Sequence, residues 1–471
     1  MTKYSKTAIG RTVLAVDTEI VIQDNFLGIN AVYHGYAYMP DDKAREYTVK
    51  QRNTELARVQ DMNLHIARTY YGTDFAWDKG SWNWNSERMT TFYKWIQAMK
   101  DRGVEVALQA AWWCPGDING TLDCKPSPLV VHDDWNASIV NYAAWVSESL
   151  FQMIEVRGFT NLKYLMMFTE PNYDSGIPPV GMTGWECWLS AVEAVHERLV
   201  ADGRRELVKF VGPNEGSTET SEMAGWVVSH GGDRCIDIYS SHNYDWKGKG
   251  HWDSYNKWRS DALSCITRLR ASSKPFWFDE YGTGNVNEKY RWEDPDYGTQ
   301  IGLANVAFLN AGVQSSLIWT LFDQQWPNNN VTTQDSFHDG VHRWGTAPTL
   351  RNSHIPYPCY YAFSLMSKYM GGPGTKVYKT ISTEGVYIAA TRQPDGNWSF
   401  LVVNACTLAR EMEVNLSSAI YKDLYRYMYN PATIRPDEKA QMTGRDKILP
   451  AVANIFNDLI PAGAVVIYSS M

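Results

Sequence analysis

Two glutamates that close apolar, strand-like runs carry the chemistry of this sequence. Glu170 closes the run LKYLMMFTE and Glu280 closes the run PFWFDE, so we expect buried backbone with side chains at the rim. Two carboxyl groups about 5 Å apart can cleave a glycosidic bond in two steps, since one attacks the anomeric carbon while the other protonates the leaving oxygen and later activates water. Mutual repulsion helps to hold one proton on such a pair. A single glutamate could equally well sit at a helix N-terminus, but two that face each other among aromatic residues favour catalysis.

The elements that must position this pair alternate between apolar runs and helical stretches. The predicted strands cover residues 25–34, 64–72, 105–113, 162–172, 208–216, 235–246, 275–282 and 315–326. A helix between successive strands makes them parallel, and eight such units predict an α/β fold of the (β/α)8 TIM-barrel type. An open doubly wound sheet is the alternative, but its first strand would lead into a Gly-rich turn, whereas here it leads into Tyr-His-Gly-Tyr.

The pattern changes after the sequence Gly-Gly-Pro-Gly at residues 371–374. Short strands separated by turn residues follow it, which predicts a C-terminal antiparallel β-sandwich domain over residues 371–471. Residues 11–21 are also strand-like, and we expect segment 1–22 to add an edge strand to this sandwich. The catalytic barrel would then span residues 23–370.

Further candidates stand at or near the ends of the predicted strands, where the active site of a barrel lies. The fourth and seventh strands, which carry the glutamates, are three steps apart in a ring of eight and so face each other. The sequence contains 20 tryptophans, and aromatic rings stack on the apolar faces of sugars as well as filling cores. The candidate substrate-binding residues are Arg68, Trp113, Thr169, Asn172, His242, Tyr244 and Trp319. A buried ion-pair partner is the structural alternative for Arg68, and a satisfied core residue for His242 or Tyr244.

Several of these motifs resemble a known group of enzymes. The string FTEPN at residues 168–172 resembles the Asn-Glu-Pro motif of clan A glycoside hydrolases, and its trailing Asn172 is most like family 39. The string FDEYG at residues 278–282 resembles the nucleophile strand of the same clan. The resemblance covers all eight predicted barrel strands, and the order and placement of the motifs make the set specific.

The resemblance implies a role for each residue. Glu170 would be the acid/base and Glu280 the nucleophile of a retaining glycosidase that uses no cofactor and no metal. Arg68 and Tyr244 would hydrogen-bond Glu280 and keep it ionised. Trp319 would stack below the sugar, and His242 would shape the same site.

One position departs from the clan. The clan places an asparagine before the acid/base, where it contacts the sugar 2-hydroxyl, and here that residue is Thr169. A hydroxyl group cannot span two partners as an amide can. The contact is therefore weaker, comes from another residue, or suits a different sugar. The clan resemblance implies a β-D-glycoside or an α-L-arabinofuranoside as substrate.

Composition limits the other function classes. The net charge of −8 leaves no basic stripe for nucleic acid, and no apolar run is long enough to cross a bilayer. The resemblance implies an oligosaccharide, polysaccharide or glycoside as the partner, while the oligomeric state is unknown. The first residues lack the apolar core of a secretory signal, so the protein is cytoplasmic or lost its signal before this numbering. A transglycosylase and a catalytically silent carbohydrate-binding barrel are the alternative functions, and Glu215 is a substrate-contact or structural residue.

Overall fold

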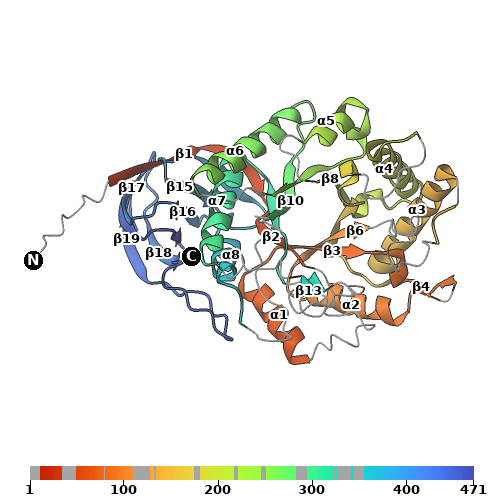
Figure 1. Cartoon of the computed structure of the whole chain (residues 1–471), viewed down its shortest axis with the longest axis horizontal. Helices are drawn as coiled ribbons and strands as arrows, with labels where there is room; N and C mark the ends of the chain where they lie inside the picture. Colours follow the sequence, from red (N-terminus) through yellow and green to blue (C-terminus); the bar gives the residue numbers. More distant parts are fainter. Residues whose placement is uncertain are drawn as a thin grey trace, which may run out of the picture.

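The chain forms a closed parallel barrel that is followed by an antiparallel β domain (Figure 1). The computed structural model describes residues 11–33, 49–78, 80–110, 128–131, 134–173, 181–216, 221–244, 251–282, 294–322, 324–325, 341–342 and 355–471. Both parts were expected from the sequence, and the predicted fold class is confirmed.

Eight strands close the barrel, each hydrogen-bonded in parallel to its neighbours. In order around the ring they are β2 (Ile29–Val32), β3 (Ile66–Tyr71), β6 (Glu105–Ala110), β7 (Leu162–Met167), β8 (Lys209–Glu215), β9 (Ile238–Tyr244), β10 (Phe276–Gly282) and β11 (Ser315–Ile318). Some predicted strands are longer than the observed ones, as in the predicted strand 162–172, where β7 ends at Met167. Because the strands are parallel, all eight carboxyl ends meet at one mouth of the barrel.

Helices surround the barrel (Figure 1). They are α1 (Val49–Asp61), α2 (Glu87–Lys100), α3 (Trp135–Leu150), α4 (Gly184–Ala201), α5 (Glu222–Ser229), α6 (His251–Arg268), α7 (Asp296–Ala311) and α8 (Pro358–Tyr369). Local sequence explains several of the starts. Ser86 and Asp134 cap α2 and α3 by accepting backbone N–H bonds, and Thr183 with Glu186 forms a capping box on α4. In the described part of the chain, no helix combines the length and apolarity needed to span a bilayer.

Short helical turns and two-residue strands lie between these helices and strands. They are η2 (Thr73–Phe75), β4 (Trp77–Asp78), β5 (Ser81–Trp82), the π-helical turn η4 (Phe151–Val156), η5 (Pro171–Tyr173), η6 (Arg205–Leu207), η7 (Gly232–Arg234), β12 (Gln324–Gln325) and β13 (Val341–His342). Of these, η5 directly follows Glu170 and so belongs to the mouth of the barrel.

The β domain is one hydrogen-bonded sheet of nine strands, in the order β19-β18-β21-β16-β15-β14-β1-β17-β20. Its strands are β1 (Arg11–Phe26), β14 (Thr375–Ile381), β15 (Val386–Arg392), β16 (Trp398–Asn404), β17 (Arg410–Leu416), β18 (Lys422–Tyr429), β19 (Lys447–Val452), β20 (Ile455–Ile460) and β21 (Val465–Ser469). The sequence patterns missed β19 and β20. The two halves of the sheet enclose an apolar core between them, and its edge strands meet where Lys447 pairs with Asp458.

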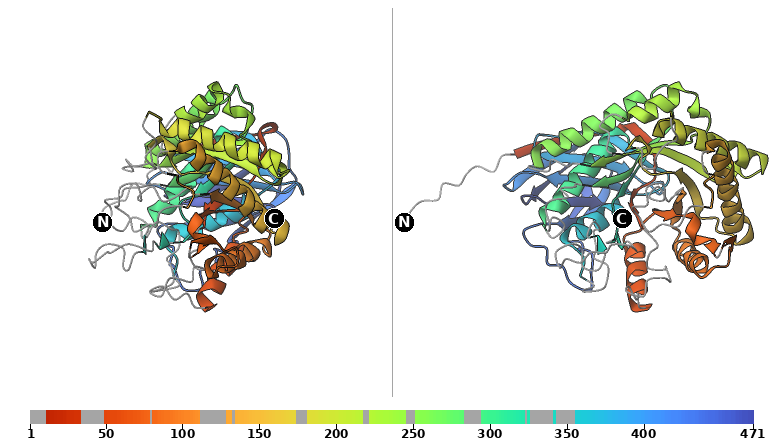
Figure 2. Two further views of the ribbon diagram at one scale, coloured as in Figure 1. Left: turned by 90° about the vertical axis from the view of Figure 1, so that its right-hand side faces the viewer. Right: turned by 45° about the vertical axis from the view of Figure 1, so that its right-hand side comes forward.

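Strand β1 lies inside this sheet and not at the edge where it was expected. It pairs antiparallel with β14 on one side and parallel with β17 on the other, with Arg11 opposite Glu411. Strand β1 bridges β14 and β17, which both follow α8 in the chain and lie on either side of β1 in the sheet. Figure 2 shows this red strand running from the blue β domain towards the barrel.

Helices α7 and α8 join the two parts. Residues of α7 and α8 and the barrel-facing side chains of β16, β18 and β21 belong to one continuous apolar core. Gly298 on α7 makes the close approach possible, because a Cβ atom there would lie 2.6 Å from the ring of Tyr429. The β domain therefore packs on the barrel through an apolar interface.

Candidate active site

Glu280 is fixed at the base of the mouth by three donors from two strands, β3 and β9. Nη1 of Arg68 donates a 2.7 Å hydrogen bond to Oε1, and the Tyr244 hydroxyl donates a 2.7 Å bond to Oε2. The hydroxyl of Tyr70 lies 3.4 Å from Oε1. The Arg68 side chain is fully buried and that of Glu280 is 5% exposed, so this charge pair is held away from water. Charge-assisted bonds of this kind favour the ionised carboxylate.

Glu170 follows β7 on a backbone that leaves the strand abruptly. Phe168 and Glu170 both have positive φ angles, of 59° and 48°, which is a strained conformation for a side chain with Cβ. The Phe168 carbonyl accepts a hydrogen bond from the Gln109 side chain, and the Glu170 N–H donates 3.0 Å to the Asn214 carbonyl. These bonds hold the turn that aims Glu170 into the mouth.

Asn172 ties the same turn to the end of β8. Its side-chain amide donates 3.1 Å to the Gly216 carbonyl, and its oxygen accepts 2.7 Å from the Gly216 N–H. Gly216 has little room for a side chain, because a Cβ atom would lie 2.9 Å from the carboxyl carbon of Glu170. Both ends of the Asn172 amide, which was predicted to bind substrate, are thus occupied by backbone.

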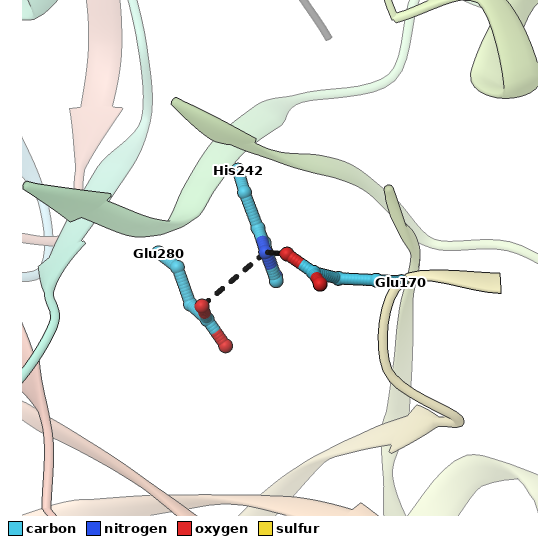
Figure 3. Close-up of side chains that lie close together, drawn as sticks. All are labelled: Glu170, His242 and Glu280. Carbon is cyan, nitrogen blue, oxygen red and sulfur yellow. Dashed lines mark hydrogen bonds and ion pairs between the residues drawn. The ribbon is translucent and has the colours of Figure 1, made fainter. Parts of the chain in front are cut away.

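His242 on β9 lies between the two carboxylates (Figure 3). Its Nδ1 atom is 2.7 Å from Oε1 of Glu170 and 3.2 Å from Oε2 of Glu280. The ring is fully buried, whereas the Glu170 side chain is 31% exposed. Among the three groups, Glu170 is therefore the one that faces the open mouth.

The ionisation of these groups is coupled through His242. Burial works against a charged Glu170, but the hydrogen bond and charge of His242, helped by Arg68, outweigh it and lower the pKa of Glu170 from 4.5. Burial raises the pKa of Glu280 despite the neighbouring cations. Burial also disfavours a charged His242, yet the surrounding carboxylates raise its pKa. The repulsion expected between the two glutamates is thus offset by an imidazole placed between them.

The remaining predicted residues flank this centre. Trp319 follows β11, is 8% exposed, and meets the ring of Tyr70 edge-on at a centroid distance of 6.2 Å. Thr169 lies next to the Tyr70 hydroxyl and works against the burial that raises the pKa of this tyrosine. Glu215 caps α5 by accepting from the N–H groups of Met223 and Ala224. Trp113 lies outside the described residues.

Four residues of the site were not among the predicted ones: Tyr70, Gln109, Asn214 and Asp279. Tyr70 could have been found by alternation, because it stands two residues after Arg68 and points to the same face of β3. Gln109 is a polar residue inside the apolar run EVALQAAWW, where a buried amide needs a partner. The role of Asn214 depends on a positive φ of 60°, which leaves no mark in the sequence.

Glu170, His242 and Glu280 also offer three ligand atoms within 4.8 Å of one another, as a metal site would. Arg68 already supplies a full positive charge to Glu280. The contacts of His242 Nδ1 with both carboxylates account for their spacing. The donor set is therefore explained by an ionic network of protein groups, and no step below uses a metal.

Comparison with known proteins finds relatives of the fold but none of the sequence. No protein-family model matches the sequence, and no curated protein resembles it in sequence. The catalytic domain of a family 30 xylanase C from Talaromyces cellulolyticus aligns with a TM-score of 0.64 at 13% identity, covering 98% of this chain and 100% of that one. A family 39 enzyme from Xanthomonas axonopodis pv. citri aligns at 0.64 and 12% identity, covering 99% of each chain.

The fold is that of glycoside hydrolases of families 30 and 39. A family 39 β-xylosidase from Caulobacter crescentus aligns over 97% of this chain and 99% of its own, with a TM-score of 0.60 and 12% identity. The alignments with family 30 and family 39 enzymes span the barrel and the β domain together. The resemblance to this group that the motifs suggested is confirmed at the level of the fold.

Proposed function

We propose that the protein is a retaining glycoside hydrolase in which Glu280 is the nucleophile and Glu170 the acid/base. The observation that carries this proposal is the spacing of the two carboxylates, which have oxygen atoms within 4.8 Å of each other. Retaining enzymes place their carboxyl groups about 5–5.5 Å apart, whereas inverting enzymes leave about 6.5–9.5 Å for a water molecule.

The surroundings of the two glutamates support different roles. Glu280 is buried and receives hydrogen bonds from Arg68 and Tyr244, so its charged form is available to attack an anomeric carbon. Glu170 is the more exposed of the pair and can reach a leaving group that enters from solvent. The first step starts from the state in which Glu170 carries a proton and Glu280 is ionised: Glu280 forms a bond to the anomeric carbon while Glu170 protonates the departing oxygen. In the second step Glu170 takes a proton from water, which displaces Glu280.

The enzymes that share this fold narrow the range of candidate substrates. Two of the aligned enzymes are described as a xylanase and a β-xylosidase. We therefore place β-D-xylosides and xylo-oligosaccharides first, followed by other β-D-glycosides and α-L-arabinofuranosides. Trp319, next to Tyr70 at the mouth, would provide the aromatic surface for the sugar.

The test is Glu280→Ala with chemical rescue. Aryl glycosides of these sugars should be turned over by the wild type with retained configuration, as followed by NMR. The variant should lose nearly all turnover, and added azide should then give the glycosyl azide of inverted configuration. Glu105→Ala, which removes a carboxylate from the opposite end of a barrel strand, is the matched control and should stay active. Activity in Glu280→Ala without azide would reject the assignment.

Product analysis at high substrate concentration completes the test. Free sugar as the main product indicates hydrolysis, and longer oligosaccharides indicate transglycosylation at the same site. A wild type that binds oligosaccharides without turnover would replace the proposal with a carbohydrate-binding barrel.

A further inference from the structure

Asp279, the residue before Glu280, faces the far side of His242. Its Oδ1 atom lies 4.0 Å from Nε2 of His242, and both side chains are fully buried. Neither of these two atoms has a hydrogen-bond partner among the described residues. The separation exceeds a hydrogen bond but falls within the range of an ion pair. Two buried polar atoms that lie this close without a hydrogen bond call for an electrostatic explanation.

The Asp279 carboxylate is held in this position from two directions. Its Oδ2 atom accepts a hydrogen bond from the Asn214 side chain. Its main-chain carbonyl accepts a 3.0 Å bond from Nη1 of Arg68, the same atom that binds Glu280. The register of β9 and β10 shifts between Phe278 and Glu280, and both acidic side chains are consequently buried beside the histidine.

The surroundings of the imidazole favour a proton on both nitrogens. Nδ1 faces oxygen atoms of Glu170 and Glu280, and Nε2 faces an oxygen of Asp279. An ionised carboxylate only accepts hydrogen bonds, whereas a neutral imidazole can donate from one nitrogen alone. The imidazolium form satisfies both sides and partly neutralises the three carboxylates around it.

We propose that Asp279 is a positioning residue that keeps His242 in its imidazolium form and thereby sets the upper pH limit of acid catalysis by Glu170. The proposal rests on the proposed function for its effect on catalysis. The protonation state of His242 is independent of that function and can be measured directly.

The other titratable groups around His242 come from the neighbouring strands. Arg68 and Tyr70 stand on β3, Glu170 follows β7, and Tyr244 lies on β9 itself. Burial raises the pKa of both tyrosines well above 10, so they stay neutral at any pH that the enzyme tolerates. Arg68 is a permanent cation that opposes a charged imidazole, whereas Glu280, Glu170 and Asp279 all favour it.

The first experiment is ¹⁵N NMR of the histidine side chains as a function of pH. The sequence contains 10 histidines, and a His242→Gln variant identifies the signal. In the wild type both nitrogens of His242 should be protonated at pH 7. In Asp279→Asn the amide NH2 can donate to Nε2, which favours the neutral ring. The midpoint of the His242 titration should therefore fall by at least about one pH unit, a tenfold loss of proton affinity.

A control separates this effect from general loss of charge. Asp237 precedes the opposite end of β9 and pairs with Arg205, so Asp237→Asn should leave the His242 midpoint unchanged. An unchanged midpoint in Asp279→Asn overturns the proposal. So does a neutral His242 at pH 7 in the wild type, a result that needs no variant to fold.

The pH profile of kcat/KM links the titration to catalysis. A neutral His242 no longer stabilises the charged form of Glu170, so the alkaline limb should move to higher pH in Asp279→Asn, with Asp237→Asn again unchanged. Loss of the His242 charge by NMR with an unmoved alkaline limb rejects the catalytic half of the proposal. Absence of any glycosidase activity with an intact NMR result rejects the proposed function and leaves the Asp279–His242 pair.

Discussion

Tyr244 donates a 2.7 Å hydrogen bond through its hydroxyl group to Oε2 of Glu280. The bond comes from the neighbouring strand of the barrel and is buried with its acceptor. It stabilises the charged carboxylate against the burial that raises the pKa of Glu280. The nucleophile is therefore kept reactive by a group that never titrates in the working range.

Tyr244→Phe should lower kcat/KM by about 10- to 100-fold, because a hydrogen bond to a charged group contributes about 1.5–3 kcal/mol. The pKa of Glu280 rises further when the donor is lost, so the acid limb of the pH profile should move to higher pH. Tyr239→Phe is the matched control, since its hydroxyl bonds Asp233 near the other end of the same strand. An equal loss in both variants would assign the effect to packing.

Glu170→Ala should affect substrates according to their leaving groups. General acid catalysis contributes about 10²- to 10⁴-fold, so glycosides with poor leaving groups should lose that much in kcat/KM. Dinitrophenyl glycosides, which leave without a proton, should lose far less in the first step. Azide should speed the second step and give a glycosyl azide of retained configuration. A uniform loss for all leaving groups would contradict the acid/base role.

Arg68→Met should destabilise the fold by about 3–5 kcal/mol at neutral pH, because it leaves a buried carboxylate unpaired. The loss should depend on pH. The pKa of Glu280 in the folded protein lies above 4.5 and rises further without Arg68, so the folded state retains a proton that the unfolded state releases. Relative to the wild type, the destabilisation should therefore grow once pH exceeds the wild-type folded pKa of Glu280, where only the variant keeps the proton, and level off above the new folded pKa.

Denaturant unfolding at several pH values measures this loss. Arg204→Met removes a partly exposed arginine that pairs with Glu155 and Asp202. That control should show a smaller loss with no increase above pH 5. A pH-independent loss in Arg68→Met would mean that packing, and not the Glu280 charge, explains the effect.

Gly216→Ala should slow catalysis without unfolding the protein. The added methyl group would lie 2.9 Å from the carboxyl carbon of Glu170 and 2.4 Å from a ring atom of Tyr173, so one of them must move. We expect kcat to fall by about 100-fold, as a displacement near 1 Å can cause. Gly444→Ala, with nothing within 4 Å of its Cβ, is the control. Normal kcat in Gly216→Ala would show that Glu170 tolerates the shift.

The sequence predicted the fold class and the two central glutamates because both depend on local patterns. Alternation of apolar runs with helices identifies a barrel, and strand ends identify its mouth. The contacts of His242 with Glu170 and Glu280 could not be predicted, since they depend on how far each strand extends into the ring. The left-handed backbone at Phe168 and Glu170 was equally invisible, because neither residue type favours it.

The β domain shows the same limit. Strands β19 and β20 were missed because they are six residues long and do not alternate between apolar and polar residues: Ile448, Ile455 and Leu459 are exposed, whereas Asp458 is buried. The interior place of β1 depends on pairing with residues that lie about four hundred positions later in the chain. No local sequence pattern indicates so distant a pairing partner.

The same pairing sets an order of events during synthesis. The ribosome releases β1 before the barrel, yet Arg11 finds its neighbour only when Glu411 has emerged. Throughout translation of the barrel, a sixteen-residue strand has both of its edges unpaired, which is a hazard for association with other nascent chains. Exposed and half-exposed polar residues along β1, such as Asp17, Glu19 and Gln23, would keep the waiting strand soluble until the last quarter of the chain arrives.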